Sequence, residues 1–231
     1  MKLYLIPTPL APDTEAFLPP AIKQTVAGLQ YFFVENPRTA RRFISSLNTG
    51  QQIRQLTLFK LDKNTKAESL AADFARIPAG EDAGVLSEAG CPGVADPGAL
   101  AVEWAHQHNA EVVPLSGPSS ILLALMGSGF SGQQFAFHGY PPIETQQRQK
   151  YLRQLEQYSA KYRQTQILIE TPYRNNSLLA DVLKTCQPQT RLCIAADVTA
   201  PEQLIKTLAV ATWQKQVPDL HKRPVVFLLM A

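Results

Sequence analysis

The chain has 231 residues, of which 45% are hydrophobic and 18% charged, and its formal net charge is +3. This length allows one large domain or two small ones, and the composition is that of a globular protein with a sizeable core. A net charge so close to zero argues against a protein held to nucleic acid by bulk electrostatics, but it allows a local basic patch. No run of about 18 apolar residues is present, so no membrane span is expected.

The cysteine count and the start of the chain predict a reduced compartment. Cys91, Cys186 and Cys193 are odd in number, and the short apolar run ended by Pro7 indicates a first strand instead of a secretory signal. We therefore expect free thiols and a cytoplasmic location. No metal site is expected, because His106 and His108 do not share a helix face.

The first half of the chain alternates strand and helix patterns. Apolar runs predict strands at 3–6, 31–35, 56–59, 84–86 and 111–115. Helical spacing predicts helices within 16–29, from near Pro19 or Pro20, and at 37–47, 65–77 and 97–108. This order predicts a mostly parallel sheet with helices on both of its faces.

Strands follow one another more closely in the second half. We expect strands at 135–137, 166–169, 192–196, 204–210 and 225–230, and helices at 121–126, 144–162 and 176–186. The long helix is rich in Gln, Arg and Lys and is expected to face solvent. The fold class is therefore α/β with two domains, residues 1–115 and 116–231, the second built on a mixed sheet.

Three strand-to-helix loops are unusually rich in small and rigid residues. They are Pro7-Thr8-Pro9, the segment 87–98 with three glycines and two prolines, and Gly117-Pro118-Ser119-Ser120. Loops at the carboxyl ends of strands bind ligands in open α/β sheets. None of the three has the spacing of a Rossmann or Walker A motif. Taken alone, Ser119 is either a helix cap or a ligand contact.

Four segments occur in an order that resembles a known family. LYLIPTPL, GVLSEAGCPGVADPG, PLSGPSS and IETPYR together resemble the tetrapyrrole methylase-like (class III) S-adenosylmethionine-dependent methyltransferases, closest to the branch that methylates ribose 2′-hydroxyls of small-subunit ribosomal RNA. The resemblance covers nearly the whole chain. It implies two α/β domains, S-adenosylmethionine in a cleft between them, and a homodimer.

The same resemblance nominates residues that contact the cofactor. They belong to the three loops, to the end of the strand at 166–169, and to two strands near the C-terminus. The positions are Pro9, Ala89, Gly90, Cys91, Val94, Ser119, Ser120, Thr171, Ala195 and Val225.

Other residues are candidates for the acceptor side and for proton transfer. Arginines at 38, 41, 42 and 174 suit a phosphodiester, with a solvated helix face or an ion pair as the alternative, and Tyr140 is a further acceptor candidate. Glu35 and Glu170, each at a strand end, are the candidate catalytic carboxylates, with a cap or an ion pair to Arg as the alternative. His138 is either structural or a proton carrier.

Two segments depart from the pattern of the ribosomal branch. The stretch 11–15 and the stretch 36–42 differ from it, as do Glu88 and Tyr173. Three functions follow: methyl transfer to an RNA ribose, methyl transfer to a tetrapyrrole or other small metabolite, and cofactor binding without turnover.

Overall fold

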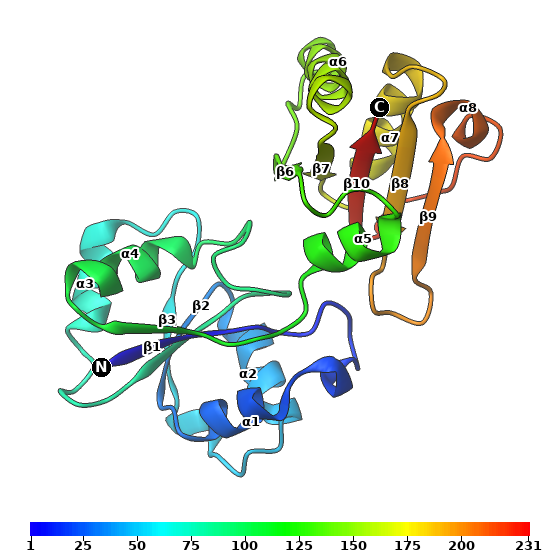
Figure 1. Ribbon diagram of the computed structural model, residues 1–231. Coiled ribbons are helices and arrows are strands. Elements are labelled where there is room, and N and C mark those ends of the chain that lie inside the picture. The colour runs from blue at the N-terminus through cyan, green and yellow to red at the C-terminus, as the bar shows by residue number, and fades with distance from the viewer. The chain divides into compact units, whose positions relative to one another are not determined.

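The computed structural model describes residues 1–231, and the chain forms two compact units. Unit 1 is Met1–Ser119 and unit 2 is Ser120–Ala231. Each unit contains one five-stranded sheet (Figure 1). The loop that ends unit 1 also contains the boundary expected after residue 115. No helix is both long and apolar enough to cross a lipid bilayer.

Unit 1 is built on a fully parallel sheet of strand order β3-β2-β4-β1-β5, which confirms the predicted fold class. Its strands are β1 (Lys2–Ile6), β2 (Tyr31–Val34), β3 (Thr57–Lys60), β4 (Ala83–Leu86) and β5 (Glu111–Pro114). Its helices are η1 (Glu15–Phe17), α1 (Pro20–Ala27), α2 (Pro37–Ser46), η2 (Ile53–Gln55), α3 (Ala67–Phe74) and α4 (Ala99–Gln107).

Helices cover both faces of this sheet because its strands are apolar on both sides. Successive side chains of a strand point to opposite faces. On β2, Phe32 packs in the cluster that includes α1 and α2, whereas Phe33 packs in the cluster that includes α3 and α4. The ring centroids of Phe33 and Phe74 are 4.3 Å apart. Unit 1 is thus a three-layer structure with its loops gathered at the sheet edges.

Local signals fix where α2 begins. The Asn36 side chain accepts a hydrogen bond from the Arg38 amide at 2.9 Å, and Pro37 occupies the first helical position. Both features favour a helix start. Because α2 begins directly after β2, its residues Thr39 and Phe43 are placed at the carboxyl edge of the sheet.

Unit 2 is built on a mixed sheet of order β6-β7-β10-β8-β9, in which only β6 and β7 are parallel. Its strands are β6 (Phe135–Phe137), β7 (Thr165–Ile169), β8 (Arg191–Ala196), β9 (Leu204–Ala209) and β10 (Val225–Met230). Its helices are α5 (Ser120–Ser128), α6 (Thr145–Tyr162), α7 (Asn175–Thr185) and the short, unpredicted α8 (Val210–Trp213). The mixed sheet confirms the prediction for the second half.

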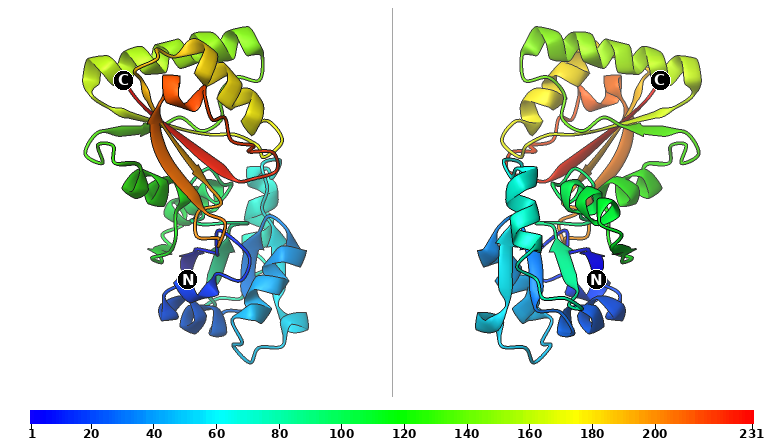
Figure 2. Two further views of the ribbon diagram at one scale, coloured as in Figure 1. Left: turned by 90° about the vertical axis from the view of Figure 1, so that its right-hand side faces the viewer. Right: turned by 90° about the vertical axis from the view of Figure 1, so that its left-hand side faces the viewer.

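The expectation that α6 faces solvent holds for most of its residues, but one face of the helix is buried. Leu152 and Leu155 are buried in the same core cluster as Phe227 of β10, and α6 and α7 lie over one face of the sheet (Figure 2). The buried guanidinium of Arg148 pairs with Asp181 of α7, with Nε and Oδ2 2.6 Å apart. Few apolar positions mark this face, so the polar sequence conceals it.

The buried pair between α6 and α7 gives a stability prediction. We expect Asp181→Ala to lower the free energy of unfolding by about 3–5 kcal/mol, because it leaves the Arg148 charge buried and unpaired. Asp73 pairs with the exposed Arg76, so Asp73→Ala is the control and costs less than about 1 kcal/mol. Urea unfolding measures both, and equal losses would contradict the prediction.

Candidate functional site

The loops after β1 and β4 are joined by backbone hydrogen bonds. Thr8 and Gly90 exchange them, from the Thr8 amide to the Gly90 carbonyl at 3.0 Å and from the Gly90 amide to the Thr8 carbonyl at 3.1 Å. The Ser87 hydroxyl also donates to the Gly90 carbonyl at 2.7 Å. Gly90 has φ +78°, a conformation that favours glycine. Two predicted ligand loops therefore form one structure.

The third predicted loop packs on the first two. Gly117 lies so close to Pro7 that a Cβ at this position would be 2.2 Å from the Pro7 Cβ. The Cys91 thiol lies 3.4 Å from the Pro118 carbonyl, to which it donates, and burial raises the pKa of this thiol. A raised pKa disfavours the reactive thiolate form of this side chain.

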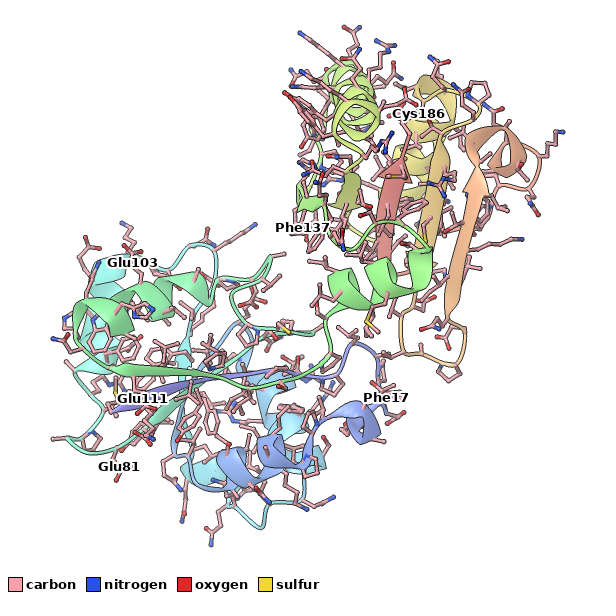
Figure 3. All side chains as sticks on the ribbon, viewed as in Figure 1. Phe17, Glu81, Glu103, Glu111, Phe137 and Cys186 are labelled. Atoms are coloured by element: carbon pink, nitrogen blue, oxygen red, sulfur yellow. The ribbon has the colours of Figure 1, made fainter.

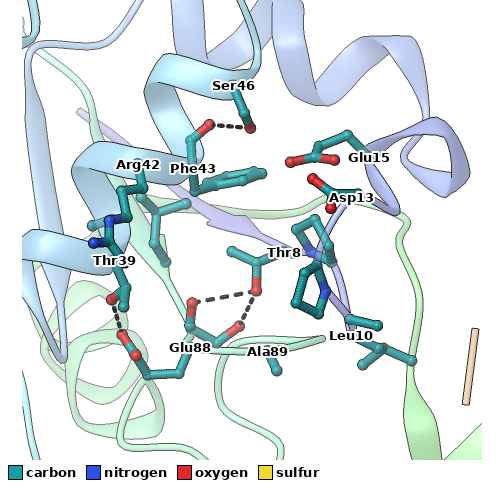
Figure 4. Close-up of a pocket in the computed structure, with 16 residues that line it drawn as sticks. Thr8, Leu10, Asp13, Glu15, Thr39, Arg42, Phe43, Ser46, Glu88 and Ala89 are labelled. Atoms are coloured by element: carbon teal, nitrogen blue, oxygen red, sulfur yellow. Dashed lines mark hydrogen bonds between the residues drawn. The ribbon is translucent and has the colours of Figure 1, made fainter. Parts of the chain in front are cut away.

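A pocket of about 440 Å³ opens beside these loops in unit 1. Residues from 8–15, from α2 and from 86–89 line it (Figure 4). Pro9 and Ala89, predicted for the cofactor, lie in this pocket together with Arg42, predicted for the acceptor. Arg38 and Arg41 lie on the exposed surface of α2 and do not line the pocket.

Carboxylates outnumber cations in the pocket. Asp13 and Glu15 lie near each other on one wall (Figure 4), Glu88 is on another, and Arg42 is the one basic residue. Glu88 accepts a hydrogen bond from the Thr39 hydroxyl at 2.6 Å. Such a lining suits a neutral or cationic group that donates hydrogen bonds more than it suits an anion.

Glu35, at the end of β2, belongs to the same acidic edge of the sheet. Burial raises the pKa of its carboxyl, and the nearby carboxylates of Asp96, Glu88 and Asp62 raise this pKa further. Asp96 accepts hydrogen bonds from the amides of Gly93 and Gly98 at 3.0 and 2.9 Å, and burial raises its pKa despite them. A carboxyl with a raised pKa is a stronger base once it is ionised.

In unit 2, Glu170 lies directly after β7 and is buried. Its Oε1 accepts hydrogen bonds from Arg174 Nη2 and from the Thr171 amide, both at 2.6 Å. The ion pair that was the alternative for Glu170 is therefore present. The other oxygen, Oε2, is buried without a hydrogen-bond partner, so this carboxylate retains a free acceptor.

The remaining predicted residues occupy varied surroundings. Ala195 is fully buried on β8, and Val225 opens β10 opposite Ala196. The side chains of Val94 and Tyr140 are exposed by 49% and 56%. His138 shares a 2.6 Å hydrogen bond with Gln166, and Ser119 and Ser120 are the residues at which unit 1 ends and unit 2 begins.

Sequence reasoning did not nominate most of the pocket lining, including two acids, a threonine and an aromatic residue of the pocket. Asp13 lies in a turn and Glu15 begins the single-turn helix η1, both too short to show a periodic pattern, and Thr39 and Phe43 read as ordinary positions of a helix. The departure of 11–15 from the family pattern was the one available signal. No group of three or more His, Cys, Asp or Glu side chains is placed to hold a metal ion.

Packing of the third loop on Pro7 gives a second prediction. We expect Gly117→Ala to lower the free energy of unfolding by about 1–3 kcal/mol, because the rigid proline ring cannot move away from the added methyl group. Gly132 has open space around it, so Gly132→Ala is the control and changes stability by about 0.5 kcal/mol or less. Chemical denaturation of both variants checks this, and a neutral Gly117→Ala would contradict the close contact.

The raised pKa of Glu35 gives a pH prediction. An acid whose pKa rises on folding destabilises the folded state at high pH, and this cost disappears below its ordinary value of 4.5, where both states are protonated. We therefore expect Glu35→Gln to raise the melting temperature at neutral pH and to leave it nearly unchanged below that value. The exposed Glu81→Gln is the control, and an equal gain for Glu35→Gln at both pH values would contradict the prediction.

Comparison with known proteins supports the same family over most of the chain. Residues 16–212 match the model of Tetrapyrrole (Corrin/Porphyrin) Methylases. The Ribosomal RNA small subunit methyltransferase I of Vibrio cholerae is 27% identical over 98% of this chain and 76% of its own. The protein of the same name from Escherichia coli O157:H7 is 25% identical over 99% of this chain and 77% of its own length.

The fold is shared with a solved structure. The crystal structure of the methyltransferase CobJ has a TM-score of 0.65 and 19% identity, covering 99% of this chain and 92% of that one. The resemblance drawn from the four segments is confirmed. The chain therefore belongs to the tetrapyrrole methylases and is an S-adenosylmethionine-dependent methyltransferase.

Proposed function

We propose that this chain transfers the methyl group of S-adenosylmethionine to a ribose 2′-hydroxyl of small-subunit ribosomal RNA. The observation that carries the proposal is the acidic pocket of unit 1, whose carboxylate lining suits a neutral nucleoside better than a polycarboxylate. The names of the relatives, which match over 98–99% of the chain, point to the same substrate.

The charge of the pocket separates the two acceptor classes. Tetrapyrroles carry several carboxylates, and Asp13, Glu15 and Glu88 would repel them, with Arg42 as the one opposing charge. A nucleoside is neutral, and its amino groups donate to carboxylates. Phe43 adds an aromatic ring to the lining on which a base can stack.

The residues present also fit the methyl donor, whose ammonium, sulfonium and ribose hydroxyls call for acceptors and small loops. The loop around Gly90 offers backbone groups with no Cβ in the way. In unit 2, the unpartnered Glu170 Oε2 is a buried acceptor suited to a cationic or hydroxyl group. We propose that the loop around Gly90 in unit 1 contacts the donor, with Pro9 and Ala89 in the same unit as further contacts. When bound, it supplies an electrophilic methyl group.

Residues of unit 1 would prepare the acceptor for in-line attack. Alignment supplies much of the rate in such a displacement. Glu35, with its raised pKa, would act as the base. One of its carboxylate oxygens would accept the proton of the 2′-hydroxyl as the ribose 2′-oxygen attacks the methyl carbon. Arg42 would hold the adjoining phosphodiester, since a guanidinium matches its two oxygens. The homodimer and the cytoplasmic location stay predictions.

Donor binding and methyl transfer test the proposal together. Calorimetry with S-adenosylhomocysteine should show binding that Gly90→Val abolishes, because valine at φ +78° is strained and its Cβ would lie 3.0 Å from Leu10. Tritiated S-adenosylmethionine should label RNA of small ribosomal subunits from cells that lack the protein, and ribose methylation should protect one bond from alkali. Glu35→Gln should lower kcat by about 10²-fold or more and leave donor affinity unchanged.

Each failure has a distinct meaning. Absence of calorimetric heat and of a thermal shift would contradict donor binding. Label in a small-metabolite fraction, with none in RNA, would support the metabolite acceptor instead. Donor binding without transfer to either acceptor would support a binding protein.

A further inference from the structure

One face of α6 carries positive charge that nothing in unit 2 neutralises. Lys150, Arg153, Lys161 and the capping Arg163 are exposed, and none takes part in an ion pair. The carboxylate of Glu156 is buried and accepts hydrogen bonds from the Gln187 amide and the Thr190 hydroxyl. The net charge of the whole chain is only +3, so this face concentrates basic charge.

Two of these cations, Lys150 and Lys161, belong to a stripe of exposed side chains along the helix, and Figure 3 shows side chains standing out from α6. Lys150, Gln154, Gln157 and Lys161 recur at helical spacing. At a rise of about 1.5 Å per residue the stripe is roughly 16 Å long. This length matches roughly five stacked nucleotides.

Two tyrosines lie beside the stripe with their rings in water. Tyr158 and Tyr162 are exposed by 42% and 50%, and their rings stack with centroids 6.0 Å apart. Gln154 donates to the Tyr158 hydroxyl at 3.3 Å, and Lys161 Nζ lies 5.0 Å from the Tyr162 ring centre. Exposed aromatic rings among cations are the combination on which single-stranded nucleic acids bind.

We propose that this face of α6, defined by Lys150, Arg153, Tyr158, Lys161 and Tyr162, docks a single-stranded segment of the RNA substrate. The inference rests on the proposed RNA acceptor and adds a second contact region, distinct from the pocket. The basic side chains bind phosphates, and the tyrosines stack on bases. A membrane surface fits poorly, because Leu152 and Leu155 of α6 are buried in the core, and an interfacial helix would expose such large aliphatic side chains to lipid.

Removal of the charge tests the docking surface in the full chain. Fluorescence anisotropy with a short unstructured RNA should show that Lys150→Gln/Arg153→Gln/Lys161→Gln weakens binding by about tenfold or more. The slope of log affinity against log salt should fall by about 2, since each single-strand phosphate contact contributes about 0.7. Lys23→Gln/Arg54→Gln/Lys215→Gln removes the same charge from exposed, unpaired positions elsewhere and should keep the wild-type slope. Equal losses in both triple variants would overturn the proposal.

Substitution of the tyrosines tests stacking separately. Tyr158→Ala/Tyr162→Ala should weaken RNA binding by about fivefold or more, whereas Tyr158→Phe/Tyr162→Phe should retain it. Binding of S-adenosylhomocysteine should be unchanged in every variant, which shows that the variants fold. If Tyr158→Ala/Tyr162→Ala binds RNA as tightly as the wild type, the claim that these tyrosines stack on bases is wrong.

The outcomes separate this inference from the proposed function. If the wild type methylates RNA and the α6 triple variant does so with unchanged KM and affinity, the docking surface is wrong and the function stands. If the wild type neither binds nor methylates RNA, the proposed acceptor fails as well. A third outcome is that the wild type sediments with phosphatidylglycerol vesicles, whereas the α6 triple variant does not and keeps the wild-type RNA affinity. This outcome would overturn the proposal in favour of a membrane surface.

Discussion

The structure of the site depends on the exchange of backbone hydrogen bonds between Thr8 and Gly90. β1 and β4 are neighbouring parallel strands, so their loops leave the same edge of the sheet, and this exchange joins them. It can form because Gly90 adopts a left-handed conformation. The pocket wall, the Ser87 hydroxyl and the position of Glu88 all follow from it. The glycine and proline content of both loops is thus a condition of the geometry.

Charge is distributed unevenly, in a way that the near-neutral total conceals. The carboxyl edge of the sheet in unit 1 gathers Glu35, Glu88 and Asp96 with two more acids of the pocket. In unit 2, the exposed charged side chains of α6 are all basic, namely Lys150, Arg153 and Lys161. The acidic pocket and the basic surface, if they are the acceptor site and the RNA contact proposed above, suit a polyanion whose reacting nucleoside is itself neutral, because phosphates and base would be recognised in different places.

The sequence predicted those features that depend on local patterns. Buried strands appear as apolar runs, and the three loops are marked by small residues, so the parallel sheet and the loop cluster could be predicted from the sequence. The pocket positions of Asp13 and Glu15 could not be predicted in this way, because a turn and a single-turn helix are too short for a periodic pattern that shows where a side chain points. The buried face of α6 is marked by few apolar residues, and its Arg148 is buried only because Asp181 on another helix neutralises it. The short α8 depends on a tertiary bond from Trp213 to the Leu192 carbonyl.

The position of β10 governs the order in which the chain can fold during synthesis. This strand is formed by residues 225–230, yet it lies in the middle of its sheet, and β7 and β8 meet only through it. Unit 2 therefore cannot close until translation has passed these residues, whereas every strand of unit 1 precedes residue 119. A nascent chain can complete the unit with the pocket first. Until β10 is added, unit 2 consists of two separate strand pairs, β6 with β7 and β8 with β9, and the open edges of β7 and β8 are the kind of exposed edge that chaperones shield.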